Sequence, residues 1–190
     1  MEKVTLNELL KLDRKKLVGK IICFPTDTVY GVGAMANDTV AINKIYEMKN
    51  RSSDKPLPIL CSNIEMVEGV AIVNKKAKEL MKKYWPGALT LIINKKENVL
   101  PNYLDTIAFR MPNSKIALSI IDHFSLFATT SINTSGEAEI NDLDEIEEKF
   151  SKYLDYLVID KEKMSEKAST ILDVTGDDVK VIRIGDIKIA

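Results

Sequence analysis

The feature that most constrains the fold is a short apolar run that ends in a cluster of polar side chains. Residues 20–24 (Lys-Ile-Ile-Cys-Phe) are too few for a helix and predict a buried strand that stops at Pro25, which has no amide donor. Residues 26–33 follow with two threonines, an aspartate, a tyrosine and two glycines. In α/β folds, polar side chains at a strand end, with glycines that let a ligand approach the backbone, indicate a small-molecule site. The stretch is neither GxxxxGK[ST] nor GxGxxG, so a solvated loop with turn glycines is the alternative.

Length and composition predict an ordinary globular protein. A chain of 190 residues, with 45% hydrophobic and 29% charged residues, is expected to form one domain over residues 1–190 with a core of its own. We expect neither a membrane span nor a signal peptide. Cys23 and Cys61 lie in apolar runs without CxxC spacing, which favours reduced, buried thiols over a zinc site. Together these features predict a cytoplasmic protein.

The charges are distributed unevenly along the chain. The net charge of −1 gives no global indication of nucleic-acid binding. Residues 75–96 nevertheless carry seven lysines and the single acid Glu79, whereas residues 137–166 carry eleven acids and four lysines. A set of solvated helix faces explains these runs as well as a binding surface does.

The four arginines are more informative than the lysines. Of the 27 basic residues 23 are lysines, so arginine is expected where a rigid planar fork is needed for phosphate or carboxylate. Arg51, Arg110 and Arg183 lie beside strand-like segments and polar clusters, whereas Arg14 lies in a charged run typical of a surface.

The remaining pattern alternates helices and strands. Thr5 and Glu8 form a capping-box pattern that predicts a helix over residues 6–16, and Asn37 or Asp38 caps a helix over residues 38–50. Further helices are predicted over 74–85, 114–124 and 142–150, and a short helix or turn over 62–70. Further strands are predicted over 57–61, 88–93, 106–112, 126–136 (with a polar end), 156–159, 169–174 and 179–184. Residues 49–55 bring three cations and two serine hydroxyls between a helix and a strand, which fits either a surface turn or an anion clamp.

Seven motifs occur in a fixed order along the chain. They are Pro-Thr-Asp-Thr-Val-Tyr-Gly (25–31), Lys-x-Arg-x-x-x-Lys-Pro-Leu (49–57), Trp-Pro-Gly (85–87), Thr-x-x-x-Arg-x-Pro (106–112), Ser-x-Asn-x-Ser-Gly (131–136), Ser-Thr (169–170) and Arg-x-Gly (183–185). This order resembles the YrdC-like family of threonylcarbamoyl-AMP synthases in its short single-domain form, over roughly residues 5–185.

The resemblance implies a fold and a reaction. The expected fold is a twisted, open, mixed α/β sheet with a concave, partly basic ligand-binding face. The expected reaction joins L-threonine, bicarbonate and ATP into threonylcarbamoyl-adenylate, with release of pyrophosphate and water. Mg²⁺ is expected to enter with ATP, bound mainly by phosphates and waters and without a dedicated protein site. Partner proteins then use the adenylate to modify an adenosine beside the anticodon of certain tRNAs.

The resemblance also assigns roles by position. The residues that it implies for nucleotide binding are Lys49, Ser53, Thr106, Ser131 and Arg183, with Arg51 and Asn133 nearby. The residues that it implies for binding threonine or its carbamate are Thr26, Arg110, Thr129 and Ser169. Lys49 and Arg51 are expected to be catalytic, on a surface concavity where fixed cations stabilise charge on the departing pyrophosphate.

Departures from the family pattern keep other hypotheses open. Residues 137–141 (Glu-Ala-Glu-Ile-Asn) replace the usual proline and small polar residues of a loop that helps to hold the nucleotide, which leaves the role of Asn141 open. One alternative is a non-catalytic module that binds double-stranded RNA or tRNA through the basic concave face and the lysines of residues 75–96. Another is a carbamoyl-adenylate enzyme of hydrogenase maturation, which is usually part of a longer chain with zinc-finger cysteines.

Overall fold

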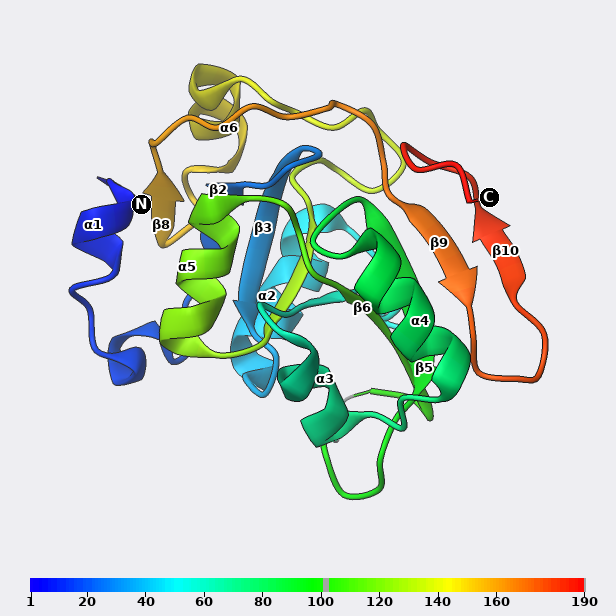
Figure 1. The fold of residues 1–190 in the computed structure, drawn as a ribbon. Coiled ribbons are helices and arrows are strands. Elements are labelled where there is room, and N and C mark those ends of the chain that lie inside the picture. Colours follow the sequence, from blue (N-terminus) through cyan, green and yellow to red (C-terminus); the bar gives the residue numbers. More distant parts are fainter. Residues whose placement is uncertain (101–102, 190) are drawn as a thin grey trace.

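A single mixed sheet forms the framework of the protein. The computed structural model describes residues 1–100 and 103–189, and its ten strands follow the order β1-β8-β2-β3-β7-β4-β6-β5-β9-β10 (Figure 1). The strands are β1 Glu2–Val4, β2 Ile22–Pro25, β3 Tyr30–Met35, β4 Ile59–Leu60, β5 Leu89–Asn94, β6 Thr106–Arg110, β7 Phe127–Ser131, β8 Tyr156–Val158, β9 Thr170–Asp173 and β10 Lys180–Arg183. The helices are α1 Leu6–Leu9, α2 Thr39–Lys49, α3 Ile64–Val70, α4 Lys75–Tyr84, α5 Lys115–Phe124 and α6 Leu143–Phe150, with a 3₁₀ turn at Arg14–Leu17. The predicted α/β class and open mixed sheet are confirmed.

The core lies on both faces of this sheet. Successive strand residues point to opposite faces, and in β2 Cys23 belongs to one apolar cluster whereas Phe24 belongs to the other. Helix α2 packs on the first face through residues such as Ile45, and α5 packs on the second through residues such as Ile120. The two helices accordingly lie on opposite sides of the sheet (Figure 1). None of the helices in the described part of the chain combines the length and the apolar character that a membrane span requires.

The polar stretch after β2 belongs to a β-hairpin, whose second strand, β3, was not predicted from the sequence. Strand β3 pairs antiparallel with β2 on one side and with β7 on the other. Its glycines allow this close packing, because a Cβ on Gly33 would lie 2.6 Å from Thr129 Oγ1 and 3.0 Å from the carbonyl oxygen of Ala128. The glycines therefore make room for β7, and residues 26–29 become the tip of a tightly packed hairpin.

Two further expectations need correction near the N-terminus. The capping box between Thr5 and Glu8 is present, but α1 ends after Leu9. Asp13 then accepts a hydrogen bond from the amide of Lys15 (2.8 Å) and starts the 3₁₀ turn, so the predicted helix over 6–16 is divided in two. Strand β1 was not predicted, because only its pairing with the distant β8 defines it. The other predicted helices and strands are found within a few residues of their expected bounds.

Candidate functional site

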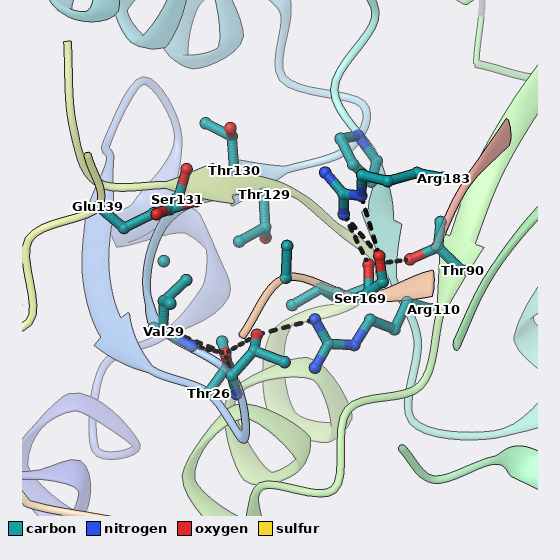
Figure 2. A pocket seen from close by; sticks show the side chains of 15 residues that line it. Thr26, Val29, Thr90, Arg110, Thr129, Thr130, Ser131, Glu139, Ser169 and Arg183 are labelled. Carbon is teal, nitrogen blue, oxygen red and sulfur yellow. Dashed lines mark hydrogen bonds between the residues drawn. The ribbon is translucent and has the colours of Figure 1, made fainter. Parts of the chain in front are cut away.

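A pocket of about 150 Å³ lies between the hairpin tip, β7, the start of β9 and β10 (Figure 2). Its polar wall includes the hydroxyl groups of Thr26, Thr90, Thr129, Thr130, Ser131 and Ser169. Its charged side chains are Arg110, Arg183 and Glu139, and Val29, Pro58 and Leu60 add apolar surface. A cavity of this volume holds one small organic molecule. The pocket therefore suits a ligand of amino-acid size, whereas a nucleotide has to extend beyond it.

Arg110, the last residue of β6, carries the buried charge of this pocket. Arg110 is only 8% exposed. Its Nε donates to the carbonyl of Gly87 (3.2 Å), Nη1 donates to Thr28 Oγ1 (3.0 Å), and Nη2 forms an ion pair with Asp27. Burial lowers the pKa of Arg110, and the negative charge of Asp27 opposes that shift. These contacts use three of the five guanidinium N–H groups, so one N–H on each terminal nitrogen is left for a ligand.

The hairpin tip that supplies Asp27 is itself held in place. Thr26 Oγ1 donates to the carbonyl of Val29 (2.7 Å) and accepts from its amide (3.3 Å), which closes the turn. From outside, the amide of Ser165 donates to the carbonyl of Asp27 (2.9 Å). The partner of Arg110 is thus fixed before any ligand arrives, which is the condition for an electrostatically preorganised site.

Arg183 in β10 lies on another wall of the pocket. Its Nε and Nη2 donate to the carbonyl of Ser169 (3.0 and 2.8 Å), and Ser169 Oγ lies 2.8 Å from Thr90 Oγ1 (Figure 2). Burial lowers the pKa of Arg183, and the Glu139 carboxylate opposes the shift. The Nη1 group has no hydrogen-bond partner within the described chain, so Arg183 can still contact an anion.

Lys49 lies behind the pocket and not on a surface concavity, which corrects the prediction. It is the last residue of α2 and is only 2% exposed. Its Nζ donates to the carbonyls of Ser131 (2.6 Å) and Asn133 (2.8 Å) and to Asn133 Oδ1 (2.5 Å). Burial is the main cause that lowers the pKa of Lys49 to about 8; the charge of Arg51 contributes to this shift, and the charge of Glu139 opposes it. Lys49 therefore fixes the end of β7 through these hydrogen bonds.

The residues predicted from the motifs fall into three groups. Six of them line the pocket together: Thr26, Arg110, Thr129, Ser131, Ser169 and Arg183. Lys49 and Asn133 lie directly behind Ser131. The others lie outside the pocket. Arg51 and Ser53 are in the loop after α2, where Arg51 Nε donates to the carbonyl of Lys55 (3.0 Å). Thr106 is at the opposite end of β6 from Arg110, about 13 Å away at 3.3 Å per residue.

Several polar and charged residues of the site were not among the assigned ones: Asp27, Thr28, Thr90, Thr130 and Glu139. Asp27 and Thr28 stand within the polar cluster at the hairpin tip, so their residue types were a signal, but their contact with Arg110 spans more than 80 residues. Thr90 gave no signal, because a lone hydroxyl in an apolar strand is common. Glu139 lies in the atypical loop, where the family pattern offers no match.

The lysine-rich segment does not contribute to this pocket. None of the lysines of residues 75–96 lines it, and those of α4 are exposed on the side opposite to the buried Ala77 and Met81. The RNA-binding hypothesis named both the concave face and these lysines, and the lysines lie outside the pocket. Within residues 1–100 and 103–189, no three His, Cys, Asp or Glu side chains form a group that could hold a metal ion.

Known relatives share both the sequence and the fold. The chain is 37% identical to the threonylcarbamoyl-AMP synthase of Pyrococcus abyssi over 162 aligned residues. This alignment covers 83% of this chain and 48% of that protein. The chain thus spans about half the length of this relative. Over 200 residues it is 36% identical to a candidate threonylcarbamoyl-AMP synthase of Methanocaldococcus jannaschii, covering 98% of this chain and 94% of that protein.

A solved structure and a family model agree with these relatives. The crystal structure of Pyrococcus abyssi Sua5 in complex with L-threonine superimposes with a TM-score of 0.87 at 32% identity, over 97% of this chain and 58% of that one. The family model for the Sua5, YciO and YrdC proteins, described as "Telomere recombination", matches residues 17–185. With most of its length matched by this model, the chain belongs to the Sua5/YciO/YrdC family.

Proposed function

We propose that this chain condenses L-threonine, bicarbonate and ATP into threonylcarbamoyl-AMP and releases pyrophosphate. The observation that carries the proposal is the buried, preset guanidinium of Arg110 in a hydroxyl-rich pocket of amino-acid size. A relative of the same fold has been solved with L-threonine bound, and a candidate synthase matches nearly the full length of the chain.

Threonine occupies the enclosed part of the pocket in this proposal. Its carboxylate accepts two parallel hydrogen bonds from the free N–H groups of Arg110, which orients the amino acid. Thr26, Thr129 and Ser169 surround it with hydroxyl groups, and Val29, Pro58 and Leu60 offer apolar surface for its methyl group.

ATP lies on the open side of the pocket, toward Ser131 and Arg183. Arg183 contacts the phosphates directly, and Arg51 and Ser53 approach from the adjoining loop. Lys49 acts by positioning, because its three hydrogen bonds fix Ser131 and Asn133 and its charge lies just below them. Thr106, at the far end of β6, has no place in this arrangement.

The chemistry needs positioning more than a protein nucleophile. The threonine amine and bicarbonate form a carbamate and water, and a carbamate oxygen then attacks the α-phosphorus while pyrophosphate leaves. Because the carbamate is short-lived in water, the site must hold it against the α-phosphate and exclude bulk solvent. Fixed cations stabilise the charge that develops on pyrophosphate. Mg²⁺, when bound with ATP, supplies further neutralisation of the phosphates.

The product is passed to proteins that modify the adenosine beside the anticodon of tRNA. Any direct contact with tRNA uses the exposed lysines of α4, which lie outside the pocket. The chain can therefore make the adenylate without RNA present.

The first prediction concerns substrate dependence. Incubated with ATP and Mg²⁺, the protein should release pyrophosphate only when both threonine and bicarbonate are present, because only their carbamate supplies the attacking oxygen. Serine should be a poorer substrate, although one methyl group is worth only about 1–3 kcal/mol. Pyrophosphate and the adenylate are measured together, the latter by mass spectrometry. Hydrolysis of ATP at the same rate without threonine contradicts the proposal.

The second prediction concerns Arg110. Arg110→Lys keeps a charge but loses the fork, so threonine affinity should fall by about 1.5–3 kcal/mol, the contribution of a charge-assisted hydrogen bond. ATP affinity, measured without threonine, should hardly change. Calorimetric titration with each ligand separately checks both, and Arg14→Lys on the surface is the matched control. An equal loss for ATP places Arg110 on the phosphates, and no loss for either ligand removes it from the site.

The third prediction separates positioning from direct catalysis at Lys49. Lys49→Met should lower the free energy of unfolding by about 1–3 kcal/mol, because buried carbonyl oxygens of Ser131 and Asn133 lose their donor. ATP affinity should fall as well, since Ser131 lies in the wall that Lys49 supports. Lys44→Met is the control, because Lys44 is exposed on the same helix and donates one hydrogen bond, to Gly19. Denaturant unfolding that leaves Lys49→Met as stable as Lys44→Met contradicts the positioning role.

A further inference from the structure

Glu139 is the acidic residue that lines the pocket, and the proposed reaction has so far not used it. The other charged side chains in the wall, Arg110 and Arg183, are both cationic. A carboxylate at this point needs an explanation, because the proposed substrates are a carbamate and a triphosphate, which are both anions.

The loop holds Glu139 in this place from both sides. On one side, Asn133 Nδ2 donates to the carbonyl of Glu137 (2.7 Å). On the other, Ile140 is buried and its amide donates to the carbonyl of Ile132 (3.1 Å). The next residue, Asn141, accepts from the amide of Tyr30 (3.1 Å), so its role is to tether the loop to β3. Figure 2 shows the side chain of Glu139 beside Ser131 at the edge of the pocket.

The carboxylate of Glu139 lies among cations without pairing to one of them. No described residue forms a hydrogen bond or an ion pair with it. Its charge nevertheless acts on both Lys49 and Arg183: burial lowers the pKa of each of these residues, and Glu139 opposes the shift. Glu139 and Arg183 also line the same pocket, where the proposed ATP phosphates lie.

Glu139 is exposed, so solvent screens its charge in part, but a triphosphate and an unpaired carboxylate in the same pocket still repel each other. A divalent cation between them turns that repulsion into attraction. Mg²⁺ prefers oxygen ligands and is commonly bound through one or two carboxylates together with substrate phosphates and water. Besides the cationic Arg183, this part of the pocket offers oxygen ligands: the Glu139 carboxylate and the hydroxyls of Thr130 and Ser131. The residues present therefore fit Mg²⁺.

We propose that Glu139 is the protein carboxylate that binds the Mg²⁺ carried by ATP. This inference rests on the proposed function, because it needs ATP on the open side of the pocket. It gives the atypical loop of residues 137–141 a task, which is to present one metal-binding oxygen opposite the cations of the site.

The test is calorimetric titration of ATP into the protein twice, with EDTA and with excess Mg²⁺. Glu139→Gln removes the charge and keeps the shape of the side chain. Compared with the unaltered chain, it should bind metal-free ATP about threefold to tenfold more tightly, because the repulsion is gone. It should bind Mg–ATP about threefold to tenfold more weakly, because a ligand of the metal is gone. The opposite signs of the two changes are the signature of a bridging cation.

Glu137→Gln is the matched control, because Glu137 is an exposed acid of the same loop that does not line the pocket. Both of its ATP affinities should equal those of the unaltered chain. If Glu139→Gln binds both metal-free ATP and Mg–ATP as tightly as the unaltered chain or more tightly, Glu139 does not bind the metal. The proposed function stands in that case. If the unaltered chain binds ATP neither with nor without Mg²⁺, the inference and the proposed function fail together.

Discussion

The site depends on one buried interaction, the ion pair between Arg110 and Asp27. A buried guanidinium is costly unless it is paired and hydrogen-bonded, and here the carboxylate of Asp27, the hydroxyl of Thr28 and the carbonyl of Gly87 all contact it. The pair ties the tip of the β2–β3 hairpin to the end of β6. It thereby closes the pocket wall and aims the remaining N–H groups of Arg110 at a ligand. The same contacts therefore stabilise the local fold and orient Arg110 to bind a carboxylate.

Lys49, behind the pocket, and Arg183, in its wall, have a similar organising role. Both side chains donate hydrogen bonds to backbone carbonyls. Lys49 donates to the carbonyls of Ser131 and Asn133, and Arg183 donates to the carbonyl of Ser169. These contacts hold the ends of β7 and β9 in place without an ion pair, so the positive charge stays available to phosphates. Glu139 lines the same pocket as Arg183, and we propose that it binds the metal that ATP carries. In the proposed function, the amino acid binds beside Arg110 and the metal-bound triphosphate binds beside Ser131 and Arg183.

The sequence predicts the parts of this site better than their connections. Arg110 was identifiable because arginine is scarce and because its motif is specific, but its partner Asp27 lies 83 residues earlier and only the fold brings the two together. Lys49 is followed by polar residues that indicate a surface turn, whereas its own side chain is buried by contacts with β7. Strand β3 escaped prediction because Gly31 and Gly33 are typical of turns, and only the packing against Thr129 explains them. Local patterns thus predict residue types and elements, and contacts between distant segments decide burial and pairing.

The most direct test of the account is a crystal structure of this chain with L-threonine bound. The account predicts that the threonine carboxylate contacts both terminal nitrogens of Arg110 while the Asp27–Arg110 pair remains in place, and that Ser131 and Arg183 stay accessible from the open side. A carboxylate bound elsewhere contradicts the account. So does one that displaces Asp27 from Arg110, because the preset guanidinium is the central claim.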